Sequence, residues 1–242
     1  MERKNLIKRC LFLICLAVIF LVMIMIMARY EEEGEKEIPF NLSKILIVSS
    51  VDGKDIDDPD NIWNIDVSQV NDVYVYLDRK EDEDCLIKSI TFENFKNLTD
   101  LEKDLKIYRP TGELEKLYTY SEENYKDKSL SFTGELIDDM KNLEISNIGG
   151  MCGFRVANEN IGKYISNEEN QEIIYDGRLL EKVGIVEEDI KLQFSFDIIV
   201  ETNENVKYKG TIVLDMPGEN LGEEGKSKIE INDFSNVVFK RI

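Results

Sequence analysis

The residues of this chain that are best suited to hold a cation lie in a dense acidic stretch, VDGKDIDDPDN, at residues 51–61. Gly53 and Pro59 interrupt the stretch, which is typical of a loop. Calcium takes about six to eight oxygen ligands, and an acidic loop outside the cell can supply several of them. The spacing differs from that of an EF-hand, which has Gly at its sixth position and Glu at its twelfth. The candidate calcium ligands, with a solvated acidic turn as the alternative, are Asp52, Asp55, Asp57, Asp58 and Asp60.

The sequence lacks the common motifs of catalytic and nucleotide-binding sites. Histidine is absent, which excludes Ser-His-Asp and Cys-His arrangements and His-ligated zinc. The motifs Ser-x-x-Lys, Gly-x-Ser-x-Gly, Gly-x4-Gly-Lys and Gly-x-Gly-x-x-Gly do not occur either, so we expect no nucleotide and no cofactor besides calcium. Glycoside hydrolysis needs only two carboxylates, about 5 Å or about 6.5–9.5 Å apart. That activity therefore stays open, although the sequence singles out no catalytic residue.

The cysteines carry no redox or metal motif. Cys10 and Cys15 fall in an apolar segment, which leaves Cys85 and Cys152 in the remainder of the chain. A disulfide between these two would close a long loop and contribute about 4 kcal/mol. Two small, buried free thiols are the alternative.

The apolar segment Cys10–Ala28 (CLFLICLAVIFLVMIMIMA) predicts a membrane-spanning helix. Its 19 uncharged residues would span roughly 28 Å as a helix, close to the thickness of a bilayer core. Lys and Arg precede it and Glu residues follow it, which predicts a cytoplasmic N-terminus and an extracytoplasmic remainder. A cleaved signal peptide is the main alternative, but Ile26 would occupy a cleavage position that requires a small residue. A buried helix of a soluble domain is the third possibility.

The charge of the remainder limits its partners. The chain has 30 Lys and Arg and 49 Asp and Glu, and the part after residue 29 carries 25 bases and 48 acids, a net charge of −23. Such a domain repels phosphate backbones, so we expect no nucleic-acid binding. Cationic partners and divalent ions suit it better, while simple solubility is an alternative reason for the charge.

Short alternating segments predict an all-β, antiparallel β-sandwich or jelly-roll fold with one or two short helices. In residues 191–201 (KLQFSFDIIVE) apolar and polar residues alternate, as in a half-buried strand, and Val206–Asp215 follows as its partner. Residues 73–77 (VYVYL) predict a central strand, with Cys85–Phe95 as its hairpin partner. A helix is predicted to begin at Asp176 and end at Gly184.

These patterns divide the chain into four parts. Residues 1–9 form a cytoplasmic tail, 10–28 the membrane helix, 29–37 an acidic linker and 38–242 a β-rich extracytoplasmic domain. A subdivision near 138–142 is an alternative to one continuous core.

Several segments resemble a family of uncharacterised, single-span envelope proteins of low-GC Gram-positive bacteria. The segments are IPFNLSKILIVSS, NDVYVYLD, IKSITFENF, EEDIKLQFSFDIIVE and DFSNVVFKRI. The resemblance implies anchor topology and a strand-rich ectodomain, with no assigned activity.

The sequence thus predicts a non-catalytic, membrane-anchored protein that binds a protein or a component of the cell envelope. A carboxylate-based hydrolase of wall glycan and a calcium-dependent adhesion module are the alternatives.

Overall fold

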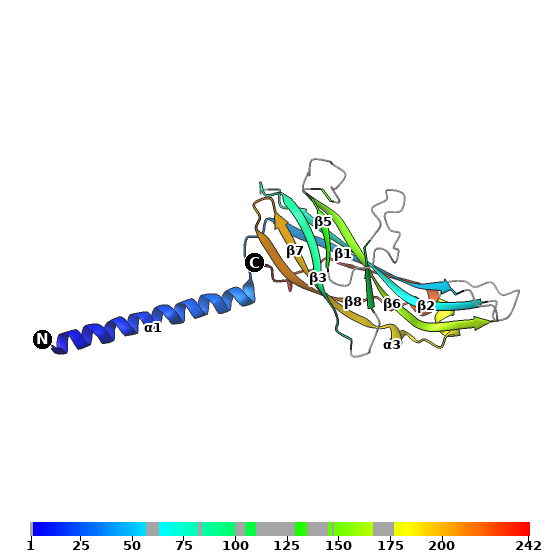
Figure 1. Ribbon diagram of the computed structural model, residues 1–242, viewed down its shortest axis with the longest axis horizontal. Helices are drawn as coiled ribbons and strands as arrows, with labels where there is room; N and C mark the ends of the chain where they lie inside the picture. Colours follow the sequence, from blue (N-terminus) through cyan, green and yellow to red (C-terminus); the bar gives the residue numbers. More distant parts are fainter. Residues whose placement is uncertain are drawn as a thin grey trace.

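The computed structural model describes residues 2–56, 63–81, 84–99, 105–109, 129–134, 145–146, 148–166 and 177–242. It has one long N-terminal helix and two antiparallel five-stranded sheets, which confirms the predicted all-β fold (Figure 1). Asp57, Asp58, Asp60 and the possible boundary near 138–142 lie outside the described residues.

The helices and strands follow the chain in an order that separates the two sheets. Sheet A has the strand order β4 (Leu105–Tyr108), β6 (Gly149–Ser166), β2 (Trp63–Arg79), β1 (Phe40–Asp55) and β9 (Lys226–Ile231). Sheet B has the order β10 (Lys240–Arg241), β8 (Lys207–Met216), β7 (Leu192–Thr202), β3 (Ile87–Asn97) and β5 (Ser129–Thr133). The helices are α1 (Glu2–Glu33), α2 (Gly177–Lys182), α3 (Glu187–Ile190) and α4 (Leu221–Glu224).

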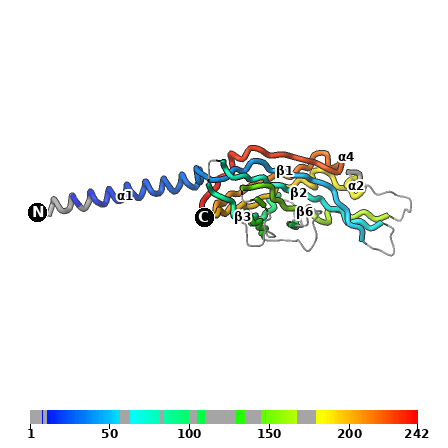
Figure 2. The backbone as a smooth tube through the Cα atoms, turned by 90° about the horizontal axis from the view of Figure 1, so that it is seen from above, coloured from blue at the N-terminus to red at the C-terminus, as the bar shows by residue number. Residues whose placement is uncertain are grey.

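Helix α1 projects away from one end of the sandwich, and none of the described strands or helices packs along its length (Figures 1 and 2). Its segment Leu11–Glu33 is long and apolar enough to cross a membrane, and the apolar part of that segment is not buried by the protein. The helix continues beyond Ala28, so the residues assigned to the start of the linker form its last turn.

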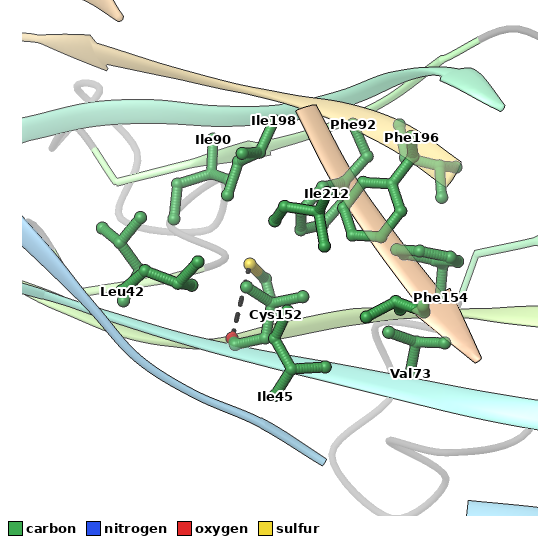
Figure 3. Close-up of a cluster of buried hydrophobic side chains, with 14 of the residues drawn as sticks. Leu42, Ile45, Val73, Ile90, Phe92, Cys152, Phe154, Phe196, Ile198 and Ile212 are labelled. Carbon is green, nitrogen blue, oxygen red and sulfur yellow. Dashed lines mark hydrogen bonds between the residues drawn. The ribbon is translucent and has the colours of Figure 1, made fainter. Parts of the chain in front are cut away.

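The main core lies between the two sheets, because alternate residues of each strand point inward. In β7, Phe194, Phe196, Ile198 and Val200 are buried, as the alternating pattern predicts. Phe154 of sheet A lies against the rings of this layer, with its ring centroid 5.0 Å from that of Phe196 (Figure 3). Aromatic contacts therefore join the sheets in the middle of the sandwich.

A second apolar cluster covers the far half of sheet A. The three long strands β1, β2 and β6 extend away from α1, and the short helices lie at this far end (Figures 1 and 2). Leu179 and Leu180 of α2 and Leu221 of α4 pack there with Ile65 and Val67 of β2. The predicted helix is confirmed as α2, whose expected cap Asp176 lies outside the described residues.

The predicted hairpin between residues 73–77 and 85–95 is wrong. Strand β2 pairs with β1 and β6 in sheet A, whereas β3 pairs with β5 and β7 in sheet B. An apolar pattern shows which face of a strand is buried but not which strand lies beside it. The central position of β2 is nevertheless confirmed, since it is the third of five strands.

The acidic stretch is also less loop-like than its composition suggests. Strand β1 continues to Asp55, and its backbone pairs Asp52 with Ser68 and Asp55 with Ile65 of β2. Gly53 does not end the strand, because it pairs with Val67 in the same ladder.

A buried polar seam crosses the inner face of sheet A, between the two apolar clusters. Its members come from three strands: Ser49, Gln69, Asn71 and Asn158. Asn71 is satisfied, because its Oδ1 accepts a hydrogen bond from Ser49 Oγ and its Nδ2 donates to the carbonyl of Val156. Gln69 is 1% exposed, and neither polar atom of its amide has a hydrogen-bond partner among the described residues.

Replacing Gln69 with methionine is therefore expected to maintain or raise stability, because it removes a desolvated amide that costs about 1–3 kcal/mol. Asn71→Leu is the matched control, since it leaves Ser49 and the Val156 carbonyl without their partner and should lower the midpoint of thermal unfolding by several degrees. A Gln69→Met variant that unfolds at clearly lower temperature than the wild type would show that the Gln69 amide is hydrogen-bonded, for example to an internal water.

Candidate functional site

A polar groove of about 450 Å³ lies on the outer face of sheet A. We call it the outer groove. Its lining comes from four adjacent strands: Asp52, Gly53 and Lys54 of β1, Asp66, Ser68 and Val70 of β2, Lys106 and Tyr108 of β4, and Arg155, Ala157, Glu159 and Asn160 of β6.

The floor of the outer groove is apolar. Val70 pairs with Ala157, and the next strand places Lys106 opposite Ala157 and Tyr108 opposite Arg155. Val70, Ala157 and Tyr108 are buried and form a small cluster of their own on this face. Strand register thus places the residues of the floor.

Ion pairs between neighbouring strands form one wall. Arg155 Nε and Nη2 donate to the two carboxylate oxygens of Asp72, at 2.7 and 3.0 Å. Lys106 Nζ lies 2.5 Å from Glu159 Oε2, and the Tyr108 hydroxyl donates to the other oxygen of that carboxylate. Paired charges of this kind hold one another in place, and a bidentate Arg–carboxylate pair is the most rigid of them.

A bulge brings further polar groups into the groove. Val67 of β2 pairs with Gly162 of β6 and Gln69 pairs with Asn158, so three residues of β6 stand opposite Ser68. Asn160 adopts a left-handed φ of 55° there, which asparagine tolerates better than most residues, and its N–H donates to Ser68 Oγ at 3.3 Å. The bulge therefore turns Glu159 and Asn160 toward the groove.

The charges lining the outer groove are balanced. Asp52, Asp66 and Glu159 supply three carboxylates, and Lys54, Lys106 and Arg155 supply three cationic groups. Lys54 and Asp66 stand opposite each other in the β1–β2 ladder. The groove consequently presents hydrogen-bond donors and acceptors side by side, with no excess of either charge.

The structure brings one candidate calcium ligand into this groove. Asp52 lines it, and its Oδ1 accepts a hydrogen bond from the N–H of Gly53 at 2.9 Å. Asp55 is exposed at the end of β1. Within the part of the chain that the structure describes, no three side chains of Asp, Glu, Cys or His are grouped as a metal site would require. Calcium binding at the acidic stretch stays a prediction.

Cys85 and Cys152, the two cysteines outside the apolar segment, form no disulfide. Cys152 is buried in the main core, and its Sγ donates to the carbonyl of Val75 at 3.9 Å (Figure 3). Burial raises the pKa of the Cys152 thiol, which keeps it protonated and unreactive. The structure therefore has no disulfide between them, and of the two predicted buried thiols only Cys152 is buried, since Cys85 is partly exposed.

Comparison of the chain with protein-family models, with curated proteins and with solved structures finds no match. The features that bear on its function are the exposed apolar helix, the outer groove and the charges. The sequence points to one groove residue, Asp52, but not to Asp66, Lys106, Arg155 or Glu159. Each of these four is an ordinary outward-facing residue of a strand, and only the strand order brings them together.

A second polar cluster lies on the outer face of sheet B. Asp197 of β7 accepts hydrogen bonds from Thr211 Oγ1 at 2.6 Å and from Asn94 Nδ2 at 2.7 Å, and Lys209 Nζ lies 2.9 Å from it. Lys209 also pairs with Glu93 at 3.2 Å. Burial favours a higher pKa for Asp197, but the hydrogen bonds from Thr211, Asn94 and Lys209 outweigh it, so the pKa lies below its ordinary value. Every oxygen of Asp197 is satisfied, which indicates a structural role.

Because the pKa of Asp197 is lowered by folding, this carboxylate stabilises the protein above the ordinary aspartate pKa of about 3.9, and the contribution is lost as the pH falls below it. An Asp197→Asn variant should lose about 1.5–3 kcal/mol at pH 7 and differ less from the wild type at pH 3. Urea unfolding at the two pH values measures this. Asp215→Asn, at an exposed position of β8, is the control and should change stability little at either pH. If Asp197→Asn lost the same free energy of unfolding at both pH values, a lowered pKa of Asp197 in the folded protein would be contradicted.

Proposed function

We propose that this chain is a non-catalytic, membrane-anchored protein whose β-sandwich binds a protein or a component of the cell envelope outside the cytoplasm. The observation that carries the proposal is the junction between α1 and the sandwich. An apolar helix that is exposed along its length is joined there to the folded domain by specific hydrogen bonds.

At the junction, residues at the end of α1 and just after it contact residues at the C-terminus of the folded domain. Glu35 N donates to the carbonyl of Phe239 at 2.7 Å, and Arg241 N donates to the Tyr30 hydroxyl at 2.9 Å. Lys240 Nζ forms an ion pair with Glu31. We call these contacts the clasp. They tie the end of α1 to the C-terminal strand, which supports an anchor that stays attached to its domain.

Phe239 connects the clasp to the core. Its ring is buried and meets the ring of Phe40 edge to face, with 5.1 Å between centroids. The membrane helix therefore ends on a packed part of the sandwich, and the domain would stand at a set orientation above the bilayer.

Charge supports the orientation of the anchor. Lys and Arg precede the apolar segment and Glu residues follow it, in agreement with a cytoplasmic N-terminus. The end of the outer groove nearest to Phe40 is at Arg155, which lies opposite Asp72 and therefore level with Val48 of β1, eight residues from Phe40. That is about 26 Å at the rise of an extended strand. That distance favours a partner in the envelope beyond the lipid headgroups.

The proposal is tested with the full chain expressed in a bacterial membrane. We expect the mature protein to begin at Met1 and the C-terminal domain to be digested by protease added from outside. A mature N-terminus at Arg29 would contradict the anchor, and a domain protected from external protease would contradict the orientation.

Binding is tested in the same cells by placing a photo-crosslinking residue at Ser68, in the outer groove, or at Val213, which is 52% exposed on sheet B. A discrete product from position 68 that is absent from position 213 supports binding through the groove. If neither position yields a product with any protein or envelope polymer, the binding role fails.

A further inference from the structure

We infer that the outer groove is a binding site for a neutral glycan segment. The inference rests on the proposed function, which it makes more specific by naming the class of envelope component. The volume of the outer groove, about 450 Å³, lies in the range of ordinary ligand sites, about 300–1,000 Å³.

The charge balance of the groove argues against charged ligands. An anionic polymer would meet Asp52, Asp66 and Glu159 on a domain that already carries a net charge of −23. A simple metal cation would find no group of three acidic side chains here, or elsewhere in the part of the chain that the structure describes. Because Arg155 and Lys106 already pair with Asp72 and Glu159, these charges need no counter-charge from a ligand.

The position of the groove on the face of the sheet argues against a peptide. An extended peptide usually binds by adding a strand to a sheet edge, where its main chain finds free N–H and C=O groups. The floor of the groove lies over β2 and β6, the third and second strands of five. There the backbone of Val70 pairs with Ser50 and Ala157, and that of Ala157 pairs with Val70 and Lys106. A ligand on this face meets side chains.

The side chains of the groove match hydroxyl groups. A hydroxyl donates one hydrogen bond and accepts others, so it is best served where donors and acceptors alternate. Asp66 and Ser68 of β2 lie beside Lys54 of β1 and Asn160 of β6, which provides such an alternation over the bulge. Val70 and Ala157 close the bottom of the groove but are only 5% and 3% exposed, so the polar side chains supply most of the surface that a ligand meets.

The ion pairs and hydrogen bonds within the wall of the groove should make the site rigid. Glu159 holds Lys106 and Tyr108 together, and Asp72 holds both nitrogens of Arg155 that face it. Preorganised polar groups lose less entropy on binding, which matters for a ligand that offers hydroxyls and little apolar area.

The experiment measures binding by titration calorimetry to the full chain in phospholipid nanodiscs. The probes are neutral tetrasaccharides of glucose and of N-acetylglucosamine, an anionic tetrasaccharide of galacturonic acid, and a neutral ten-residue peptide. We expect a neutral tetrasaccharide to bind at least tenfold more tightly than the anionic sugar and the peptide.

Two groove variants locate the site. Asp66→Ala removes an acceptor, and Ser68→Trp fills the groove without changing its charge; each should weaken binding of the neutral sugar at least tenfold. Asp215→Ala, on the exposed face of sheet B, is the control and should leave binding unchanged. Circular dichroism of each variant verifies the fold.

The inference is overturned if no neutral tetrasaccharide binds at millimolar concentration, if the peptide or the anionic sugar binds better, or if both groove variants bind as the wild type does. Crosslinking from Ser68 in cells separates this failure from that of the proposed function. A crosslinked protein together with absent sugar binding removes only the glycan inference, whereas absence of both removes the proposed function as well.

Discussion

Replacing Phe154 with alanine is expected to lower the free energy of unfolding by about 3–5 kcal/mol. Phe154 is fully buried at the centre of the sandwich, and its ring centroid lies 5.2 Å from that of Phe92 and 5.0 Å from that of Phe196 (Figure 3). The alanine would leave a cavity between the sheets and remove several aromatic contacts at once. Since domains are stable by only about 5–15 kcal/mol, the loss is a large part of the total.

Chemical denaturation of the full chain in detergent, followed by near-ultraviolet circular dichroism, measures this effect. Val213→Ala is the control, because Val213 is 52% exposed on the outer face of β8 and its truncation should change stability by about 0.5 kcal/mol or less. A loss below about 1 kcal/mol for Phe154→Ala would be incompatible with a ring packed between the two sheets.

The sequence predicts the buried faces of the strands well. In residues 191–201 the apolar members of the alternation are the ones that face the core, and Ile199, which breaks the pattern, lies on the outer face. This succeeds because a side-chain period of two follows directly from strand geometry. The hairpin of β7 and β8 is also predicted, since a short turn joins the two strands.

Long-range strand order could not be obtained in the same way. Strand β2 pairs with β1, which precedes it, and with β6, which begins about seventy residues later in the chain. Nothing in the pattern of 73–77 distinguishes β6 from β3 as a neighbour, because both offer alternating apolar residues. The choice depends on how all ten strands fill the two sheets.

The outer groove could not be predicted from the sequence, because it too depends on long-range strand order. Its charged residues lie on four strands, and Arg155 with Asp72 or Lys106 with Glu159 become pairs only through the β2–β6 and β4–β6 registers. The acidic stretch drew attention by its density, yet of its two described candidate calcium ligands, Asp52 and Asp55, the first lines the groove and the second does not. Local composition is therefore a poor guide to where polar groups meet on a sheet.

The clasp could not be predicted from the sequence either, because residues 29–37 have the composition of a solvated linker. Their partners lie about two hundred residues away, at the C-terminus. The decisive residue is Gly34, which follows α1 with a φ of +68° and whose N–H donates to the carbonyl of Tyr30 at 2.8 Å. Glycine commonly ends a helix in this conformation because a side chain there is strained.

Gly34→Ala is expected to open the clasp. A Cβ at this position would lie 2.4 Å from the carbonyl oxygen of Phe239 and 2.5 Å from Val238 Cγ1, so the chain must move away from the strand that holds it. The hydrogen bonds of Glu35 N and Arg241 N would then be lost. Hydrogen exchange of these two amides should become at least tenfold faster.

Gly184→Ala is a closely matched control. Gly184 has a φ of +72° near the end of α2, but nothing lies within 4 Å of the Cβ that alanine would add. The two variants share the cost of a left-handed alanine, about 1 kcal/mol, and differ in the steric conflict. Gly184→Ala should therefore leave exchange at Glu35 and Arg241 unchanged.

The consequence for function is a change in how the domain is held. If the clasp sets the orientation, spin labels on α1 and on Val213 should give a narrow distance distribution in nanodiscs that broadens in Gly34→Ala and stays narrow in Gly184→Ala. A distribution that is equally narrow in both variants would mean that packing of Phe239 against Phe40 holds the domain without the clasp. A broad distribution in the wild type would contradict a fixed orientation, and the outer groove would then sample a range of heights above the membrane.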